Sequence, residues 1–194
     1  MNEWESSKPG SDNRAIVALG ANLPHAGLAG APLLAAAIRA MVAANVRVLA
    51  VSSAWRSPAW PPGSNQPDYV NAVAAIGPEG WTPQSLLARL LEIERAFGRE
   101  RGVRWAARTM DLDIVDFAGL TLAEAGLTLP HPRVAERAFV LAPLAEIAPR
   151  HRFPNGKSAL TLLQALGPQP IERLGPLPDL GPLRDCETPG EGIS

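Results

Sequence analysis

Residues 98 to 117 (GRERGVRWAARTMDLDIVDF) constrain the fold most strongly, because an arginine-rich segment leads directly into a short apolar one. Asp111 and Asp113 alternate there with Leu112 and Ile114, a pattern that predicts a β-strand beginning at residue 110 or 111. Residues i and i+2 of a strand share a face. The two carboxylates are therefore expected to point the same way, while the apolar side chains pack on the other face.

The charges around this strand indicate a polyphosphate site. Two neighbouring carboxylates repel each other unless positive charge lies near them, and Mg²⁺ prefers such oxygen ligands together with substrate phosphates. Arg99, Arg101, Arg104 and Arg108 precede the strand, and guanidinium groups bind phosphate oxygens bidentately. From these residues alone, a solvated strand face beside a solubilising arginine-rich loop remains an open alternative.

Composition predicts one globular domain for the 194-residue chain, and its net charge of −1 gives no general attraction to nucleic acid or acidic membranes. Cys186 is the only cysteine, which excludes an intramolecular disulfide. The sequence has no apolar run of about 18 residues, and its first residues lack the apolar core of a signal peptide. We therefore expect a soluble cytoplasmic protein.

The hydrophobic pattern predicts three further strands and two long helices. The strands are expected at residues 15–19, 46–53 and 69–76. The helices are expected at residues 32–44 and 83–97, the second after an N-cap at Thr82. This order predicts an α+β fold, a ferredoxin-like sandwich in which helices pack on one face of a mostly antiparallel sheet.

The remaining segments are predicted to be loops, short elements and tails. Residues 55–68 contain four prolines and are expected to form a long, semi-rigid loop. A short strand is expected near residues 120–122, and a last helix at 159–166. The folded domain is expected to span residues 15–166, between a disordered tail (1–14) and a Pro/Gly-rich tail (167–194).

Proline and glycine positions shape two expectations in the C-terminal half. A short helix or ordered turn is expected within residues 136–149, ended by Pro143 and Pro149. Residues 156–158 (GKS) resemble the end of a P-loop. They lack its first glycine and a preceding strand, so an ordinary turn is expected.

Several polar residues could be either structural or functional. Asn71 lies among apolar residues and needs hydrogen-bond partners; it could offer a donor and an acceptor to a heterocycle, but capping a loop is the simpler interpretation. His131 lies between two prolines, where a structural role is the more common one. Residues 20–23 (GANL) could approach a ligand closely, although a plain strand-to-helix turn is simpler.

Taken together, six motifs closely resemble the 6-hydroxymethyl-7,8-dihydropterin pyrophosphokinase family of folate biosynthesis, in order and in spacing. The resemblance covers residues 15 to about 166. The motifs are ALGANL at 18–23, SPAW at 57–60, QPDYVNAV at 66–73, E-x-x-x-G-R-x-R at 94–101, RTMDLDI at 108–114 and LPHPRVAERAFVLAPLAEIAP at 129–149.

The resemblance implies transfer of a pyrophosphoryl group from ATP to the hydroxymethyl group of a reduced pterin, giving the pterin diphosphate and AMP. It implies that Asp111 and Asp113 hold two Mg²⁺ ions, with Arg99 and Arg108 also catalytic. The ATP-binding residues implied are Glu94, Arg99, Arg101, Arg104, Arg108, Ile114, Thr128, His131 and Arg137. The pterin-binding residues implied are Ser57, Pro58, Trp60, Tyr69, Asn71, Trp105, Asp111 and Phe139, with Tyr69 and Phe139 as the two aromatic walls.

The departures from the family pattern are modest. Ala21 replaces the usual Ser, Ala107 a common Pro and Trp60 a smaller apolar residue, so they bear on loop dynamics and affinity. Two rival classes of protein fit the sequence less well. An RNA-binding module of ferredoxin-like fold would carry an RNP1 pattern, which is absent. An inactive homologue would have lost a core Asp or Arg, and none is lost. We expect a monomer with no nucleic-acid or membrane partner.

Overall fold

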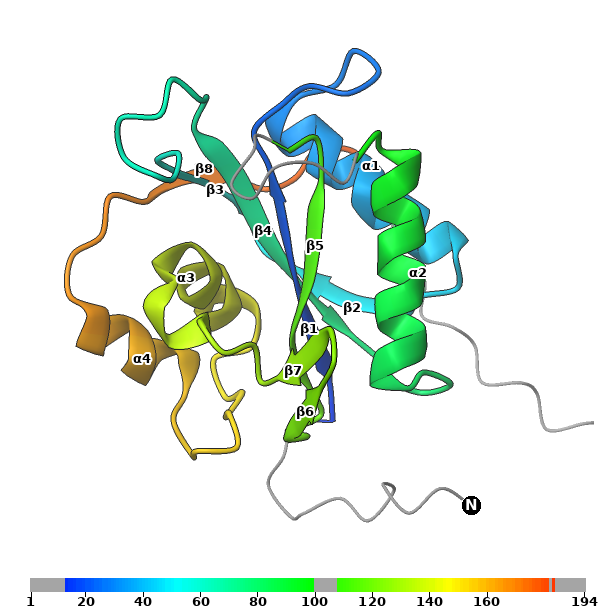
Figure 1. Ribbon diagram of the computed structural model, residues 1–194, viewed down its shortest axis with the longest axis vertical. Helices are drawn as coiled ribbons and strands as arrows, with labels where there is room; N and C mark the ends of the chain where they lie inside the picture. The colour runs from blue at the N-terminus through cyan, green and yellow to red at the C-terminus, as the bar shows by residue number, and fades with distance from the viewer. Residues whose placement is uncertain (1–12, 100–107, 182, 184–194) are drawn as a thin grey trace, which may run out of the picture.

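The computed structural model describes residues 13–99, 108–181 and 183, and these form a sheet with helices packed on it (Figure 1). The strands of the main sheet are β1 (Ala15–Ala21), β2 (Val48–Val51), β3 (Ala54–Ser57), β4 (Tyr69–Ile76), β5 (Asp111–Phe117) and β8 (Glu172–Gly175). The order is β5-β1-β4-β3-β8, and β2 also pairs with β4. Every pairing between these strands is antiparallel, which confirms the predicted α+β fold.

Helices cover both faces of the sheet, so the expectation of a single covered face was wrong. The helices are α1 (Gly30–Ala43), α2 (Pro83–Ala96), α3 (Ala138–Ile147) and α4 (Ala159–Leu166). Val17 and Leu19 of β1 pack in the core beneath α1 and α2, whereas Ile16 packs in a second core beneath α3 and α4. A strand buried on both faces has a continuous apolar sequence, as AIVAL does.

The local signals for the start of α2 are confirmed. The Thr82 hydroxyl accepts a hydrogen bond from the Ser85 amide at 3.1 Å, and the Ser85 side chain accepts from the Thr82 amide, which completes a capping box. Pro83 occupies the first turn, where its missing N–H costs nothing. Together these contacts fix the start of α2, and Gly98 follows its C-terminus in a left-handed conformation.

Two other expectations need correction. β3 extends to Ser57, into the segment expected to be a loop (55–68), because it pairs with β4 on one side and with β8 on the other. Pro143 lies inside α3 and does not end it. One lost backbone hydrogen bond is outweighed there by the burial of apolar side chains such as Leu141 and Leu144.

The last part of the chain contributes more than the sequence indicated. In place of one short strand, β6 (Leu122–Glu124) and β7 (Leu127–Leu129) form a hairpin, followed by the 3-10 helix η2 (Val134–Glu136). Gly156 closes a turn that starts at Phe153, and Ser158 is the N-cap of α4, which agrees with the expected turn. β8 lies beyond residue 166 and forms an edge of the main sheet. None of the helices in the described part of the chain has the length and hydrophobicity that a membrane span requires.

Candidate active site

β5 presents its first two aspartates on one face, as the alternation predicted. Leu112 and Ile114 are buried in the core beneath α1 and α2. The Asp111 and Asp113 side chains remain 24 % and 39 % exposed and line the same cavity. The strand therefore fixes two carboxylates side by side at its open end.

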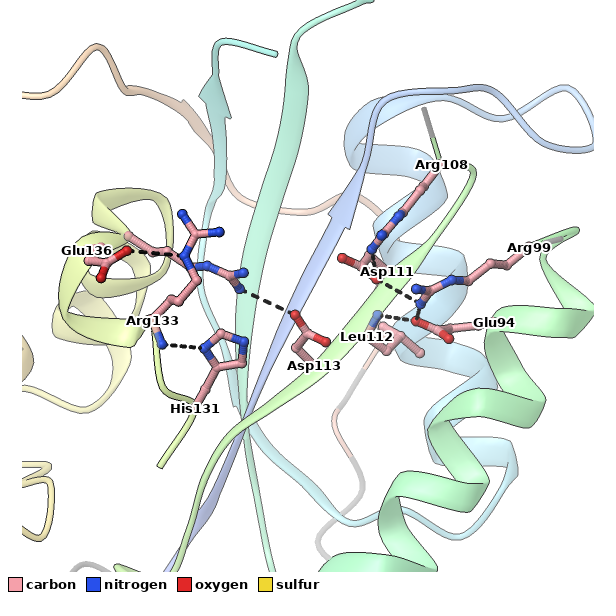
Figure 2. Close-up of polar contacts among 10 residues, drawn as sticks. Glu94, Arg99, Arg108, Asp111, Leu112, Asp113, His131, Arg133 and Glu136 are labelled. Atoms are coloured by element: carbon pink, nitrogen blue, oxygen red, sulfur yellow. Dashed lines mark hydrogen bonds and ion pairs between the residues drawn. The ribbon is translucent and has the colours of Figure 1, made fainter. Parts of the chain in front are cut away.

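Arginines from three segments surround these carboxylates (Figure 2). Arg99 and Arg108 each place a guanidinium nitrogen close to Asp111 Oδ1, at 2.7 and 2.8 Å. Arg137 lies 3.4 Å from Asp113 Oδ2. Burial and the neighbouring Asp113 raise the pKa of Asp111 and outweigh the opposite effect of Arg108 and Arg99. The site thus combines concentrated negative charge with cations that can turn towards an anionic ligand.

Glu94 supports this arrangement from behind. Its side chain is buried, and its Oε1 atom accepts a hydrogen bond from the Leu112 amide at 2.7 Å while pairing with Arg99. Burial raises its pKa, more than the Leu112 hydrogen bond and Arg99 lower it. Because Arg99 touches both Glu94 and Asp111, this carboxylate positions an arginine of the site and the strand that carries the aspartates.

His131 approaches the aspartates from the segment after β7. Its amide donates to the Val115 carbonyl at 2.8 Å, which ties that segment to β5. Its Nδ1 atom accepts a hydrogen bond from the Arg133 amide at 3.1 Å, so the proton of the neutral ring lies on Nε2. Burial, followed by the charge of Arg137, lowers the pKa of His131. The ring therefore offers an N–H donor on Nε2.

A cavity of about 750 Å³ opens beside the two aspartates, between β4, β5, α3 and the loop after β3. Tyr69 at the start of β4 and Phe139 at the start of α3 both line it. The Arg137 guanidinium lies 5.8 Å from the centroid of the Phe139 ring, which is a cation–π distance. Aromatic side chains on two different elements thus line a space that is large enough for a flat bicyclic ring.

Asn71 links β4 to β3 and does not simply cap a loop. Its Nδ2 atom donates to the Trp55 carbonyl at 3.3 Å and to the Ser57 hydroxyl at 2.9 Å. Its side chain is almost fully buried and also lines the cavity. No donor among the described residues is hydrogen-bonded to its Oδ1 atom, so this oxygen is the group that can accept from a ligand.

The structure brings ten of the predicted site residues together around the large cavity. They are Ser57, Pro58, Trp60, Tyr69, Asn71, Arg108, Asp111, Asp113, Arg137 and Phe139. The lining does not include His131 or the predicted ATP contacts Glu94, Arg99, Ile114 and Thr128. Glu94 and Arg99 instead line a smaller space of about 210 Å³ beside α2. Arg101, Arg104 and Trp105 lie outside the described residues.

Sequence reasoning missed several residues that line the large cavity. Gln66 and Asp68 belong to the motif at 66–73, which implies a role for Tyr69 and Asn71 but none for these two residues. Arg133 and Glu136 flank predicted residues. Residues 169–171 come from the segment before β8, and no local signal could have found them, because they reach the cavity only through the pairing of β8 with β3.

The donor set around the aspartates suits Mg²⁺. In the part of the chain that the structure describes, no group of three or more His, Cys, Asp and Glu side chains converges on one point. A closed cage for Ca²⁺ or Zn²⁺ is therefore not formed by these residues. Two carboxylates facing a cavity fit Mg²⁺, which commonly takes one or two protein carboxylates and completes its shell with phosphates and water.

Comparison with known proteins gives one consistent result. The model of a family described as 7,8-dihydro-6-hydroxymethylpterin-pyrophosphokinase (HPPK) matches residues 16–149. A 2-amino-4-hydroxy-6-hydroxymethyldihydropteridine pyrophosphokinase of Methylorubrum extorquens is 40% identical over 163 residues, 83% of this chain and 98% of that protein. The protein of the same name from Pseudomonas aeruginosa is 42% identical over 130 residues, covering 67% of this chain and 79% of that protein.

Solved structures agree at the level of the fold. The crystal structure of wild-type Plasmodium falciparum HPPK-DHPS with pteroate matches with a TM-score of 0.58, at 11% sequence identity. The match covers 79% of this chain and 44% of that longer one, so the chain spans less than half of its length. At this identity the likeness shows that the two share an α+β fold, and no more.

Proposed function

The chain belongs to the 7,8-dihydro-6-hydroxymethylpterin-pyrophosphokinase family, and on this premise we propose that it transfers pyrophosphate from ATP to 6-hydroxymethyl-7,8-dihydropterin. The products are the pterin diphosphate and AMP, and the reaction belongs to folate biosynthesis. The observation that carries the proposal is the pair Asp111 and Asp113, held side by side at the mouth of a cavity with aromatic residues on two sides.

The pterin binds between Tyr69 and Phe139, whose rings stack on its flat faces. Asn71 reads its polar edge. Because the Nδ2 atom of Asn71 already donates to β3, the Oδ1 atom is left to accept from the amino and ring N–H groups of the pterin. The Ser57 hydroxyl, which accepts from Asn71 at 2.9 Å, fixes the orientation of this amide. Stacking supplies affinity and the amide supplies identity.

The triphosphate lies across the open end of β5. Arg108 and Arg137 line the large cavity, and Arg99 lies on the α2 side of Asp111. Their guanidinium groups neutralise the charge that develops on the phosphate oxygens during in-line attack at the β-phosphorus. His131 adds an uncharged N–H donor, which contributes a hydrogen bond at the edge of the site. Positioning and charge neutralisation therefore supply most of the rate.

Asp111 and Asp113 are the residues that would hold two Mg²⁺ ions. Bound there, Mg²⁺ would neutralise negative charge on the phosphates and lower the pKa of the pterin hydroxyl, so that no strongly basic side chain needs to contact this hydroxyl. The chain's own contribution is to fix the two carboxylates on one face of β5. The Leu112 amide, which lies between them, donates a hydrogen bond to Glu94 and so anchors this part of the strand to α2. We also propose that the enzyme is a cytoplasmic monomer.

A direct assay tests the proposal. The protein is incubated with ATP, Mg²⁺ and the reduced pterin alcohol, and the nucleotide products are separated by chromatography. We expect AMP and the pterin diphosphate in equal amounts, and neither when the pterin or Mg²⁺ is omitted. Formation of ADP in place of AMP would show transfer of a single phosphoryl group, and no nucleotide turnover would refute the activity.

A further inference from the structure

Asn22 connects the two halves of the site, although no role was expected for it. It lies in the turn after β1, and only 8% of its surface is exposed. Its side-chain amide is hydrogen-bonded to two segments that are far apart in the sequence, around residue 108 on one side and residues 66 and 67 on the other. One of these segments carries a phosphate-binding arginine, and the other leads into a pterin wall.

On the nucleotide side, Asn22 fixes the backbone of Arg108. Its Oδ1 atom accepts a hydrogen bond from the Arg108 amide at 2.8 Å. The Asn22 and Leu23 amides both donate to the Arg108 carbonyl, at 3.1 Å each. The backbone at Arg108 is therefore held through both its N–H and its C=O group, three residues before Asp111, to which its guanidinium binds.

On the pterin side, the Nδ2 atom of Asn22 donates to the Pro67 carbonyl at 3.2 Å and to Gln66 Oε1 at 3.4 Å. The next residues along the chain are Asp68 and Tyr69, and both line the cavity together with Gln66. The loop that brings Tyr69 into position is thus anchored, just before β4 begins, on the same amide that holds Arg108.

Only an asparagine-like side chain can satisfy both partners from this position. The Arg108 amide requires an acceptor and the Pro67 carbonyl requires a donor, so the orientation of the amide is fixed by its partners. A longer glutamine would have to displace one of them. An aspartate would keep the acceptor for Arg108 and lose the donor for Pro67.

We propose that Asn22 is a positioning residue that holds the phosphate-binding Arg108 and the pterin-binding Tyr69 segment at a fixed separation. The inference rests on the proposed function for the identity of the two ligands. Because the Arg108 amide needs an acceptor and the Pro67 carbonyl needs a donor, different substitutions of Asn22 can remove one hydrogen bond or both. Asn22→Asp removes the donor to the Pro67 carbonyl and keeps the acceptor for the Arg108 amide. Asn22→Ala removes both sides.

Dissociation constants distinguish the two variants. Affinity for a non-hydrolysable ATP analogue with Mg²⁺, and for the pterin in its presence, is measured by calorimetry. Loss of one buried hydrogen bond typically changes an equilibrium constant about 10-fold. We therefore expect Asn22→Asp to weaken pterin binding about 10-fold and to change the affinity for the ATP analogue by less than about threefold. Asn22→Ala is expected to weaken both. Asn45→Asp, in an exposed turn after α1, is the control for the added charge and should alter neither.

Amide hydrogen exchange at Arg108 gives a readout that needs no ligand. We expect the Arg108 amide to be protected in the wild type and in Asn22→Asp, where the acceptor remains, and to exchange faster in Asn22→Ala. Equal loss of both affinities in Asn22→Asp, or unchanged exchange in Asn22→Ala, would overturn the proposal. If the wild-type protein produced no AMP, the proposed function alone would fail, because the exchange measurement would still test the positioning.

Discussion

Both ends of β5 carry aspartates on the same face of the sheet, but those at one end face a cavity and the one at the other end is buried. At the open end, Asp111 and Asp113 line a cavity. At the other end, a bulge between the Ile114 and Asp116 pairings with β1 leaves Val115 as an extra residue, so that Asp116 also faces α3. Its side chain is completely buried beside His151.

The two ends of β5 differ in the positive charge that lies next to their aspartates. The open end has three arginines within 3.4 Å of its carboxylates. Asp116 accepts one hydrogen bond, from the Gly119 amide at 2.9 Å, and lies 3.6 Å from His151 Nε2. Burial raises the pKa of Asp116 to about 6, against a smaller opposing effect of the Gly119 hydrogen bond. We infer that the open end is built to bind charged ligands and that the buried end affects stability alone.

Asp113→Ala is expected to have the largest effect, on activity. Removing one of the two carboxylates that would hold Mg²⁺ should lower kcat by about 10³-fold or more, since metal-based stabilisation of a transition state is worth several kcal/mol. The rate of AMP formation measures this. The melting temperature should not fall, because the substitution also relieves the repulsion with Asp111.

Asp116→Asn is the matched control for that experiment, because it also removes an aspartate from β5. It should retain near-native AMP formation. Near-native activity of Asp113→Ala with Mg²⁺ present would refute the metal-binding role, and a large loss of activity in Asp116→Asn would show that the two ends of the strand are not functionally distinct.

Arg108→Ala should have the next largest effect, on nucleotide affinity. Loss of a bidentate guanidinium contact to phosphate should weaken binding of the ATP analogue about 10- to 100-fold. Arg108→Lys should recover part of this affinity, because lysine keeps the positive charge but cannot form the bidentate contact. Calorimetric titration measures both. Arg47→Ala removes an exposed ion pair with Glu79, so it serves as a control that should leave the affinity unchanged. Equal affinity in Arg108→Ala and wild type would remove Arg108 from the phosphate site.

The sequence predicted the open end of β5 well because its signals are local. Alternation placed Asp111 and Asp113 on one face, and the capping residues Thr82 and Pro83 marked the start of α2. Each depends only on residues a few positions apart, so tertiary contacts did not need to be known. The resemblance to the family then supplied roles that spacing alone left open, such as those of Asn71 and His131.

The parts that were missed depend on contacts between distant segments. β3 is a strand because β4 and β8 pair with it, and its sequence, AWRS, carries no strong strand pattern. The side chain of Asp116 faces α3 because a bulge shifts the alternation of β5 by one residue. A simple two-residue alternation in the sequence would place it on the other face. Likewise, the partners of Asn22 are 44, 45 and 86 residues away in sequence.

Asp116→Asn should have the smallest effect, a change in how stability depends on pH. In the unfolded chain Asp116 loses its proton near the ordinary value of 3.8, whereas the folded protein keeps it up to about 6. Between these values the folded state binds more protons than the unfolded state, so the free energy of unfolding falls as pH rises through this window. Asparagine carries no such proton, and its oxygen can still accept from Gly119.

The variant should therefore match the wild type near pH 4 and exceed its free energy of unfolding above pH 6 by about 1 to 3 kcal/mol, at 1.36 kcal/mol for each pKa unit. Urea denaturation at pH 4.5, 6 and 7.5 measures the difference, and His151→Gln isolates the neighbouring ring. A variant less stable than wild type at pH 7.5 would show that Asp116 is charged there and stabilised by His151, and that this end of β5 is also provided with a counter-charge.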